Sequence, residues 1–278
     1  MELFMRFPEG RAKALTFSYD DGVKQDGRLI EILNAHGMKG TFNINGNRFA
    51  PEEQADNPDY NCYSKQAALQ IYVEPHEVAL HSYTHPFLES LPTGMCAYEI
   101  VSDRVALENL FGKIVRGMAY PMGTYSDTVI DVLKSCGVVY SRTTKATEKF
   151  DLPSDFLHWN PTCHHNHPRL MELADEFLNQ KVRHYPKLFY LWGHSYEFRN
   201  NDNWNIIESF TDKMAGHEDT VWYATNMEIY EYMTDYNRLV WSADGLIVNN
   251  PTTRTLWFER NHVLFSIEPG KTIRVDGK

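Results

Sequence analysis

The sequence predicts an α/β protein with a mostly parallel sheet. Short apolar runs recur along the chain, and each is followed by a polar turn and then by a segment with helical spacing. This alternation is typical of repeated βα units. The length of 278 residues falls in the range of a single α/β barrel with one large core, and the chain shows no repeat of fixed period. We therefore expect one barrel and no second domain of similar size.

The predicted strands are short apolar runs bounded by turn residues. The first run, residues 14–19, ends directly before Asp20. We expect seven strands, at residues 14–19, 40–45, 77–81, 114–120, 138–142, 156–160 and 188–194. Helical spacing predicts helices at residues 27–36, 97–110, 128–135, 169–179 and 205–213.

The pattern changes after about Tyr236, where β-prone runs are broken by turn residues. These runs lie at residues 239–241, 246–248, 255–258 and 263–265. We predict a barrel over residues 1–235 and a short C-terminal β extension over residues 236–278, packed on the barrel. The extension is either a carbohydrate-binding appendage or a cover for an exposed barrel edge, and we favour the cover.

Composition and charge narrow the range of partners. Hydrophobic residues make up 42% and charged residues 23% of the chain, which is ordinary for a globular protein. The formal net charge of −10 argues against nucleic acid or an anionic membrane as the main partner, because both require a basic face. A neutral or cationic ligand fits the net charge better.

The start of the chain has no basic segment followed by an apolar run, and no stretch approaches the ~20 apolar residues of a membrane-spanning helix. We therefore predict a cytoplasmic protein, with an exported form that has lost a signal peptide as the alternative. The four cysteines, Cys62, Cys96, Cys136 and Cys163, are widely separated. This spacing predicts reduced thiols rather than a disulfide framework. The oligomeric state stays open.

Three polar clusters follow predicted strands. Asp20 and Asp21 follow the first strand, His81 and His85 stand four residues apart at the end of the third, and His194 ends the last. Parallel sheets present functional side chains at the carboxyl ends of their strands. On a single helical turn, the four-residue spacing would put both imidazoles on one face, where they could share a cation.

Each cluster has a simple structural explanation when it is taken alone. An Asp-Asp-Gly sequence is a common turn, and a histidine at the end of a strand is often a hydrogen-bonded core residue. Together, however, the clusters supply two histidines and one acid for a metal, a second acid as a base and a third histidine as an acid. This set predicts metal-assisted hydrolysis.

The order of these clusters resembles the polysaccharide deacetylase family, the NodB-homology group of carbohydrate esterases (family 4). Residues 16–22 resemble its first motif, residues 81–85 match its second and residues 191–194 resemble its last. Residues 37–42 also fit the approach to the second strand. The resemblance covers roughly residues 10–235 and implies a distorted (β/α)7 barrel of the NodB type.

The resemblance also implies a role for each site residue. Asp21, His81 and His85 would bind a divalent cation, with Zn²⁺ expected and Co²⁺, Ni²⁺ or Mn²⁺ as alternatives. Asp20 would be the base for a metal-bound water that attacks the acyl carbonyl, and His194 would protonate the leaving group. The implied activity is removal of acetyl groups from an N- or O-acetylated carbohydrate.

The third family motif, usually Arg-x-Pro-Tyr-Gly, is altered here. Residues 119–123 read Ala-Tyr-Pro-Met-Gly, so Ala119 stands at the arginine position. That arginine orients the catalytic aspartate in the family, and we expect Arg142, at the end of the next strand, to substitute for it. Arg116 is the less favoured candidate. Met122 stands where the family offers a backbone N–H to the oxyanion, and a backbone donor survives a side-chain change.

Residues 159–167 are the most unusual stretch of the chain. Three histidines and a cysteine lie within it: Cys163, His164, His165 and His167. They invite a second metal site. We favour a rim loop that lines the substrate groove, with Trp159 as an aromatic platform. Tyr120, Met122 and Trp192 complete the expected substrate-binding set, because aromatic rings at strand ends can stack on sugars.

Two other functions stay open. The same barrel supports a metal-dependent amidase that acts on a small non-sugar amide. A carbohydrate-binding relative that has lost turnover is the second alternative, and the missing motif arginine is the observation that keeps it in play.

Overall fold

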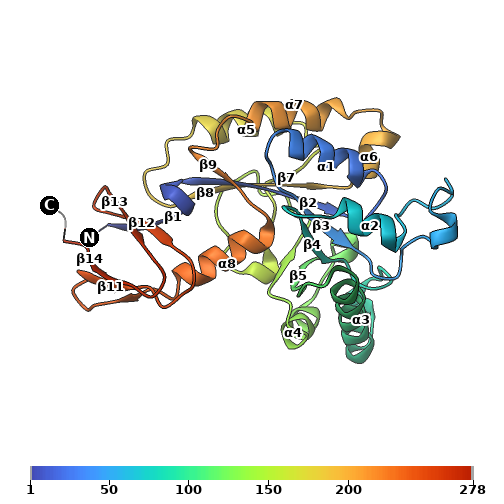
Figure 1. Cartoon of the computed structure of the whole chain (residues 1–278), viewed down its shortest axis with the longest axis horizontal. Coiled ribbons are helices and arrows are strands. Elements are labelled where there is room, and N and C mark those ends of the chain that lie inside the picture. The colour runs from blue at the N-terminus through green and yellow to red at the C-terminus, as the bar shows by residue number, and fades with distance from the viewer. Residues whose placement is uncertain (1, 277–278) are drawn as a thin grey trace.

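The central strand of the protein is β2 (Lys13–Asp20), and all eight of its residues are buried. Burial on both faces explains why the strand reads as an almost continuous apolar run. In the computed structural model, which describes residues 2–276, β2 pairs in parallel with β3 (Thr41–Ile44) on one side and with β8 (Lys187–Gly193) on the other (Figure 1). Asp20 and Asp21 therefore lie at the carboxyl end of the central strand of the sheet.

The parallel strands follow the order β6-β5-β4-β3-β2-β8-β7, and β9 pairs with the first half of β2. The strands not yet given are β4 (Glu77–Leu80), β5 (Gly117–Ala119), β6 (Tyr140–Arg142), β7 (Cys163–His164) and β9 (Val221–Tyr223). A parallel bridge between Arg142 and Trp159 joins β6 to the segment that leads into β7, so the two ends of the sheet meet. The predicted α/β barrel is confirmed.

Helices cover both sides of this sheet (Figure 1). The five predicted helices are present as α1 (Asp26–Ala35), α3 (Thr93–Phe111), α4 (Asp127–Ser135), α5 (Leu170–Asn179) and α7 (Asn205–Met214). Three further helices are α2 (Lys65–Ile71), α6 (Ser195–Asn200) and α8 (Asn226–Tyr236). Their apolar faces turn inward: α5 buries Leu170, Leu173 and Phe177, which lie three to four residues apart.

Short 3₁₀ turns connect several of these elements. They are η1 (Pro8–Gly10), η2 (Glu52–Gln54), η3 (Leu88–Ser90), η4 (Pro121–Gly123) and η5 (Phe156–His158). The strand predicted at residues 156–160 is therefore wrong. The Asp155 carboxylate accepts the N–H of Leu157 and starts η5 there, and the strand of this region, β7, begins only at Cys163.

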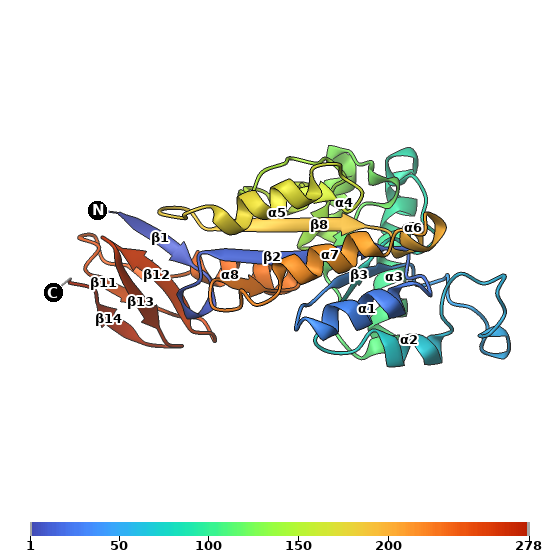
Figure 2. The ribbon, with the colours of Figure 1, turned by 90° about the horizontal axis from the view of Figure 1, so that it is seen from above.

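The C-terminal residues form two antiparallel three-stranded sheets at one end of the barrel (Figure 2). One contains β10 (Val240–Trp241), β11 (Ile247–Asn249) and β14 (Thr272–Arg274), and the other contains β1 (Leu3–Arg6), β12 (Leu256–Arg260) and β13 (Val263–Ile267). The N-terminal strand thus pairs with β12. A hydrophobic cluster that includes Phe7, Ala14, Tyr232 and Phe258 packs these sheets against α8 and the start of β2. The domain division at residue 235 and the role of the extension stay predictions.

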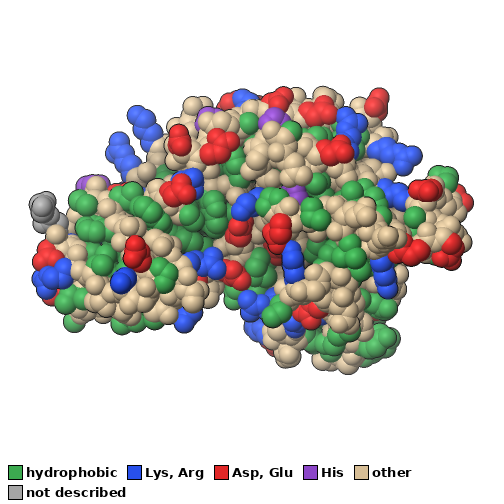
Figure 3. All heavy atoms as spheres, viewed as in Figure 1, with side chains coloured by type: hydrophobic (Ala, Val, Ile, Leu, Met, Phe, Trp, Pro, Cys, Tyr) green, Lys and Arg blue, Asp and Glu red, His purple; other side chains and the backbone are tan. Residues whose placement is uncertain are grey.

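The surface shows mixed charge. Acidic and basic side chains are interspersed on the face drawn in Figure 3, and hydrophobic side chains gather there over the C-terminal sheets. Within residues 2–276, no helix has the length and apolar character needed to cross a bilayer. The four cysteines are free thiols, as predicted.

Candidate active site and metal centre

Two adjacent carboxylates lie at the carboxyl end of β2 but face different surroundings. Asp20 is 2% exposed and belongs to the strand, whereas Asp21 has a positive φ of 80° and begins the turn that follows. This backbone reversal separates the two side chains. Asp20 can therefore remain inside the barrel while Asp21 reaches the more open edge of the site.

The two histidines of the second cluster meet through a tight bend. His81 follows β4, and the chain then turns with positive φ values at Ser82 (62°) and His85 (63°). The hydroxyl of Ser82 accepts the N–H of His85 at 3.1 Å. The helical turn expected at residues 81–85 is wrong, but the bend still brings the Nε2 atoms of His81 and His85 to 3.2 Å.

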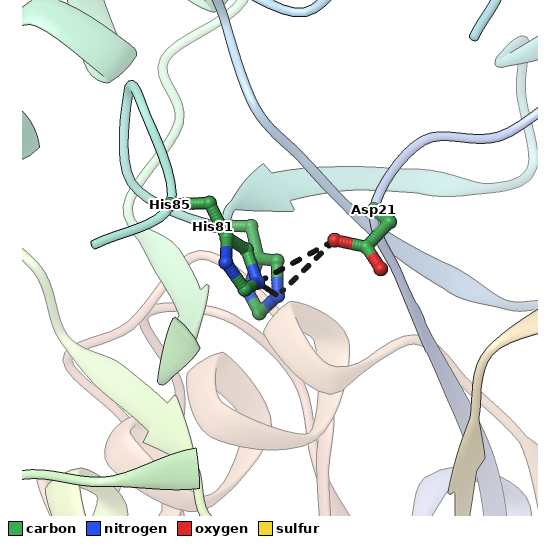
Figure 4. Close-up of side chains that lie close together, drawn as sticks. All are labelled: Asp21, His81 and His85. Atoms are coloured by element: carbon green, nitrogen blue, oxygen red, sulfur yellow. Dashed lines mark hydrogen bonds and ion pairs between the residues drawn. The ribbon is translucent and has the colours of Figure 1, made fainter. Parts of the chain in front are cut away.

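Asp21, His81 and His85 converge on one point (Figure 4). Oδ1 of Asp21 lies 3.5 Å from Nε2 of His85 and 3.9 Å from Nε2 of His81. Nδ1 of His81 donates to the carbonyl of Ala119 at 2.9 Å, so its Nε2 presents a lone pair to the cluster. Burial and the neighbouring His81 lower the pKa of His85, which favours the neutral imidazole that a metal requires. The donor set fits a divalent cation.

Side chains from neighbouring elements hold this bend in place. Asn45, one residue past β3, donates its amide N–H groups to the carbonyls of His81 and Ser82 at 2.6 and 2.7 Å. Asp103 of α3 accepts the backbone N–H groups of Gly46 and His81 at 2.6 and 3.0 Å. Asp103 thus ties the loop after β3 to the loop after β4. We did not predict either residue, although Asn43 and Asn45 alternate at a strand end in the manner of side chains that share a face.

The carboxylate of Asp20 is surrounded by polar side chains. Its Oδ1 accepts the amide of Asn43 at 2.8 Å, and its Oδ2 accepts a hydrogen bond from Nη2 of Arg142. Oδ2 also lies 3.9 Å from Nε2 of His81 and 4.0 Å from Nε2 of His194. Burial raises the pKa of Asp20, but the Arg142 guanidinium and the two imidazoles more than offset this effect, and the pKa is lowered.

Arg142 reaches Asp20 from the end of β6. The side chain is completely buried, and its guanidinium lies 4.3 Å from the centre of the Trp192 ring. Nε donates to the hydroxyl of Ser18 at 3.3 Å and Nη1 to the carbonyl of Thr143 at 3.2 Å. The structure therefore brings Arg142, not Arg116, against the buried carboxylate. Arg116 is 4.0 Å from Glu231, a residue of α8.

The third histidine, His194, is hydrogen-bonded to Glu197, a carboxylate that we did not predict from the sequence. Nδ1 of His194 donates to Oε1 of Glu197 at 3.0 Å, which leaves Nε2 facing Asp20. Burial lowers the pKa of His194, but Glu197, Asp20 and Asp21 overcome this effect and the pKa is raised. Glu197 stands one helical turn after His194 on α6, so an acid three residues beyond the motif histidine was the available signal.

Two histidines of the 159–167 stretch, His164 and His165, lie close to the second carboxylate oxygen of Glu197, Oε2. Oε2 lies 3.0 Å from Nε2 of His165, 3.3 Å from Nε2 of His164 and 2.9 Å from the amide of Asn166. Burial raises the pKa of Glu197, but the neighbouring imidazoles of His165, His194 and His164 reverse the effect and lower it strongly. Residues 163–165 belong to the barrel wall, because β7 pairs with β8, so the expected rim loop is wrong at these positions.

The burial of Trp159 and Tyr120 contradicts their predicted role in substrate binding. Trp159 is 1% exposed and packs among the rings of Tyr140, Phe156 and Tyr190, so it is a core residue. Tyr120 is also 1% exposed, and its hydroxyl donates to the carbonyl of Leu157. Neither ring offers a face to a sugar.

The two remaining residues of that set differ from each other. Trp192 is 8% exposed and lies between the Arg142 guanidinium and the ring of His164, which leaves little surface for a ligand. Met122 is 51% exposed and has a positive φ of 58° in the turn after β5. Of the four, Met122 is the one that the structure places at an open surface.

Comparisons with known proteins agree with this architecture. The family model described as polysaccharide deacetylase matches residues 8–141. A chitooligosaccharide deacetylase of Azorhizobium caulinodans is 28% identical over 128 residues, which are 45% of this chain and 55% of that protein. The curated relatives are matched over only 29% to 55% of their length.

Solved structures share the fold at low sequence identity. A Mycobacterium smegmatis protein assigned to the polysaccharide deacetylases superimposes with a TM-score of 0.57 at 16% identity, over 83% of this chain and 93% of that one. The peptidoglycan deacetylase PdaC of Bacillus subtilis gives a TM-score of 0.50 at 16% identity, over 81% and 94%. The family model matches a little under half of this chain, and together with the shared fold it supports a polysaccharide deacetylase domain of the NodB type.

Proposed function

We propose that this chain is a metal-dependent hydrolase that removes acetyl groups from a carbohydrate. The observation that carries the proposal is the convergence of Asp21, His81 and His85 beside a buried carboxylate and a third histidine. A metal donor set, a base and an acid then lie within one site, as hydrolysis of an amide or ester requires. The curated relative from Azorhizobium caulinodans, a chitooligosaccharide deacetylase, supports the carbohydrate class.

Asp21, His81 and His85 would hold the cation. Two imidazole nitrogens and one carboxylate oxygen form a donor set that suits Zn²⁺, with Co²⁺, Ni²⁺ or Mn²⁺ as alternatives. When bound, the cation supplies Lewis acidity that polarises water and the acyl carbonyl. Asn45 and Asp103 keep the two imidazoles in position by fixing the backbone around them.

Asp20 is the proposed base. Its lowered pKa keeps it ionised at neutral pH, and Asn43 and Arg142 hold both of its oxygens in fixed positions. Arg142 is a positioning residue, since its own contacts are to Asp20, Ser18 and Thr143 and it is fully buried. Asp20 would take the proton of the attacking water on Oδ2, the oxygen nearest to His81.

His194 is the proposed acid, and its Nε2 lies 4.0 Å from Oδ2 of Asp20. Glu197 holds its Nδ1 proton, so Nε2 is the atom that would pass a proton to the departing amine or alcohol. The raised pKa of His194 increases the share of the protonated ring near neutral pH. The backbone N–H of Met122 is the proposed second donor to the developing oxyanion.

The test is acetate release from a panel of N-acetylated and O-acetylated oligosaccharides. We expect activity that is lost with a chelator and restored by Zn²⁺. Asp20→Asn and His194→Ala should each lose ~10²–10⁴-fold in kcat. Zn²⁺ content, measured by mass spectrometry of the desalted protein, should stay near that of the wild type in both variants. Full activity in either variant would remove the role assigned to that residue.

The same panel separates the alternatives. Release of acetate from small non-sugar amides but not from the sugars would favour the amidase. Chelator-independent binding of sugars without any acetate release would favour a non-catalytic carbohydrate-binding protein.

A further inference from the structure

A groove of about 550 Å³ opens beside the proposed metal site. One wall is the loop at residues 46–62, which projects from the barrel at the right of Figure 1, and Tyr196 of α6 also lines the groove. Its lining includes Tyr60, Asn61, Asp59 and Arg48. Its size suits a small ligand or one part of a larger ligand, and the mixture of rings and amides suits a sugar.

Arg48 occupies an unusual place in this groove. Its Nη1 lies 3.3 Å from Oδ1 of Asp21 and 3.4 Å from Oδ1 of Asn45, while 45% of its side chain is exposed. Oδ1 of Asp21 is also the atom that faces both imidazoles. A cation held by Asp21, His81 and His85 would therefore share its carboxylate oxygen with the guanidinium.

Electrostatics favour the divalent cation over the Arg48 guanidinium at Oδ1 of Asp21. Arginine cannot release its proton, so two positive charges would stand a few ångströms apart around one oxygen. A single exposed ion pair adds ~0–1 kcal/mol and does not hold the long side chain against that repulsion. The backbone N–H of Arg48 is bonded to the carbonyl of Asn45, so the displacement would involve the side chain, which is 45% exposed, and not the backbone.

We propose that Arg48 is a carboxylate-binding residue, and that the substrate is an acetylated sugar with a carboxylate close to its acetyl group. Arg48 is the basic residue among those that line the groove. Planar guanidinium groups bind carboxylates through two parallel N–H bonds. This inference rests on the proposed deacetylase function and specifies its substrate class.

The net charge of −10 taken alone favours neutral or cationic ligands over an anionic sugar. The field inside the groove is local, however. With a divalent cation in place, the charges of the cation, Arg48 and Arg142 about balance those of Asp20, Asp21, Asp59 and Glu197, and Arg48 is the positive side chain that lines the groove itself. An anionic sugar would thus be repelled by the protein at a distance and attracted at the site, so its binding should depend strongly on Arg48.

The test compares two N-acetylated tetrasaccharides at saturating Zn²⁺. One is neutral chitotetraose, and the other alternates N-acetylglucosamine with glucuronate. We expect wild type to prefer the acidic substrate, and Arg48→Gln to lower the ratio of the two kcat/KM values by ~10–100-fold, the size of a lost charged hydrogen-bond pair. Arg238→Gln is the matched control: it removes the same charge from an exposed side chain that is paired with Asp235 on α8.

A binding measurement keeps the inference separate from turnover. Calorimetric titration of the acidic tetrasaccharide into Zn²⁺-loaded Asp20→Asn should give a Kd at least fivefold tighter than that of chitotetraose. The added Arg48→Gln change should abolish this difference.

Three outcomes would overturn the inference. Equal losses on both substrates would make Arg48 a structural residue, and unchanged activity on both would mean that Arg48 does not contact the substrate. Weaker inhibition by acetate, without a change in the ratio, would assign Arg48 to the released product. If no acetylated sugar is hydrolysed but the acidic one still binds through Arg48, the proposed function fails and the carboxylate site stands.

Discussion

Replacing Arg142 by methionine removes the charge opposite Asp20 and keeps a side chain of comparable length. Both partners are buried, at 0% and 2% exposure, and a hydrogen bond joins them. Breaking one side of a buried pair costs ~3–5 kcal/mol, because the other charge stays in the interior without its partner. Domains have ~5–15 kcal/mol of stability in total, so Arg142→Met should fold but unfold at a much lower urea concentration.

A double variant isolates the pair itself. Arg142→Met together with Asp20→Asn removes both charges, and Asn43 can still donate to an amide oxygen at position 20. We expect the double variant to recover most of the stability that Arg142→Met loses, which a double-mutant cycle measures directly. Neither variant should be active, since the base is lost in one and mispositioned in the other.

The stability difference between wild type and Arg142→Met should also depend on pH. In the wild type the pKa of Asp20 is lowered, so the pair stabilises the fold above the ordinary carboxyl range near pH ~4 and is lost only as the pH falls through the lowered pKa. Without Arg142, burial dominates and the pKa of Asp20 should rise. The difference in unfolding free energy should therefore be smallest in acid and widen toward pH 7.

Urea unfolding of wild type, single and double variants between pH 4 and 8 checks this reasoning. A stability difference that does not change with pH, or a double variant no more stable than Arg142→Met, would refute the buried ion pair. Zn²⁺ content is the accompanying control. Arg142 does not belong to the donor set of Asp21, His81 and His85, so the metal should bind normally.

Three further predictions follow from the same structure. Zn²⁺ at ~1,000 times its Kd should raise the free energy of unfolding of the wild type by ~4 kcal/mol, as seen by thermal or urea unfolding, and Asp21→Asn should lose most of this gain. Trp159→Ala should cost ~3–5 kcal/mol, because the ring is buried, while the Zn²⁺ content of the folded protein stays unchanged; a small loss would contradict its place in the core. Burial raises the pKa of Glu77 to about 7, so ionisation should make the wild type lose stability as the pH rises from ~4.5 to 7. Glu77→Gln keeps the oxygen that accepts from Thr41 and Met227, while its amide N–H would donate to the Tyr140 hydroxyl, and it should remove that loss, so its stability relative to wild type should increase with pH.

The parts of the fold that the sequence predicted are those with strong local patterns. β2 and β8 are long apolar runs, and α5 and α7 have clear helical spacing. The strand placed at residues 156–160 failed because a local hydrogen bond from Asp155 set a 3₁₀ turn, which apolar content alone does not reveal. A stronger signal was overlooked at α8, where Thr225 and Glu228 form a capping box that can be read directly from the sequence.

The candidate site could be predicted where side chains follow strand ends, and not where they reach in from elsewhere. Asp103 enters from the buried face of α3, and its role depends on the tertiary position of that helix, which no local pattern encodes. The aromatic platforms failed for a related reason. Whether a ring at a strand end faces the groove or the core depends on the pairing of its strand, and the pairing of Trp159 with Arg142 turns that ring inward.

The two histidine clusters of the site show how one backbone contact decides the chemistry of an imidazole. Nδ1 of His81 faces the carbonyl of Ala119 and must donate to it, so Nε2 keeps a free lone pair for a cation. Nδ1 of His164 instead accepts the backbone N–H of Asn166 at 3.1 Å, so in the neutral ring the proton lies on Nε2 and points at Glu197. The first arrangement suits a metal ligand and the second suits a donor that keeps a carboxylate ionised. The tautomer of His164 therefore fits the support of Glu197, and through it of His194, although one ligand atom each of His164, His165 and Glu197 also lies within 4.8 Å of the other two, a spacing that could hold a metal.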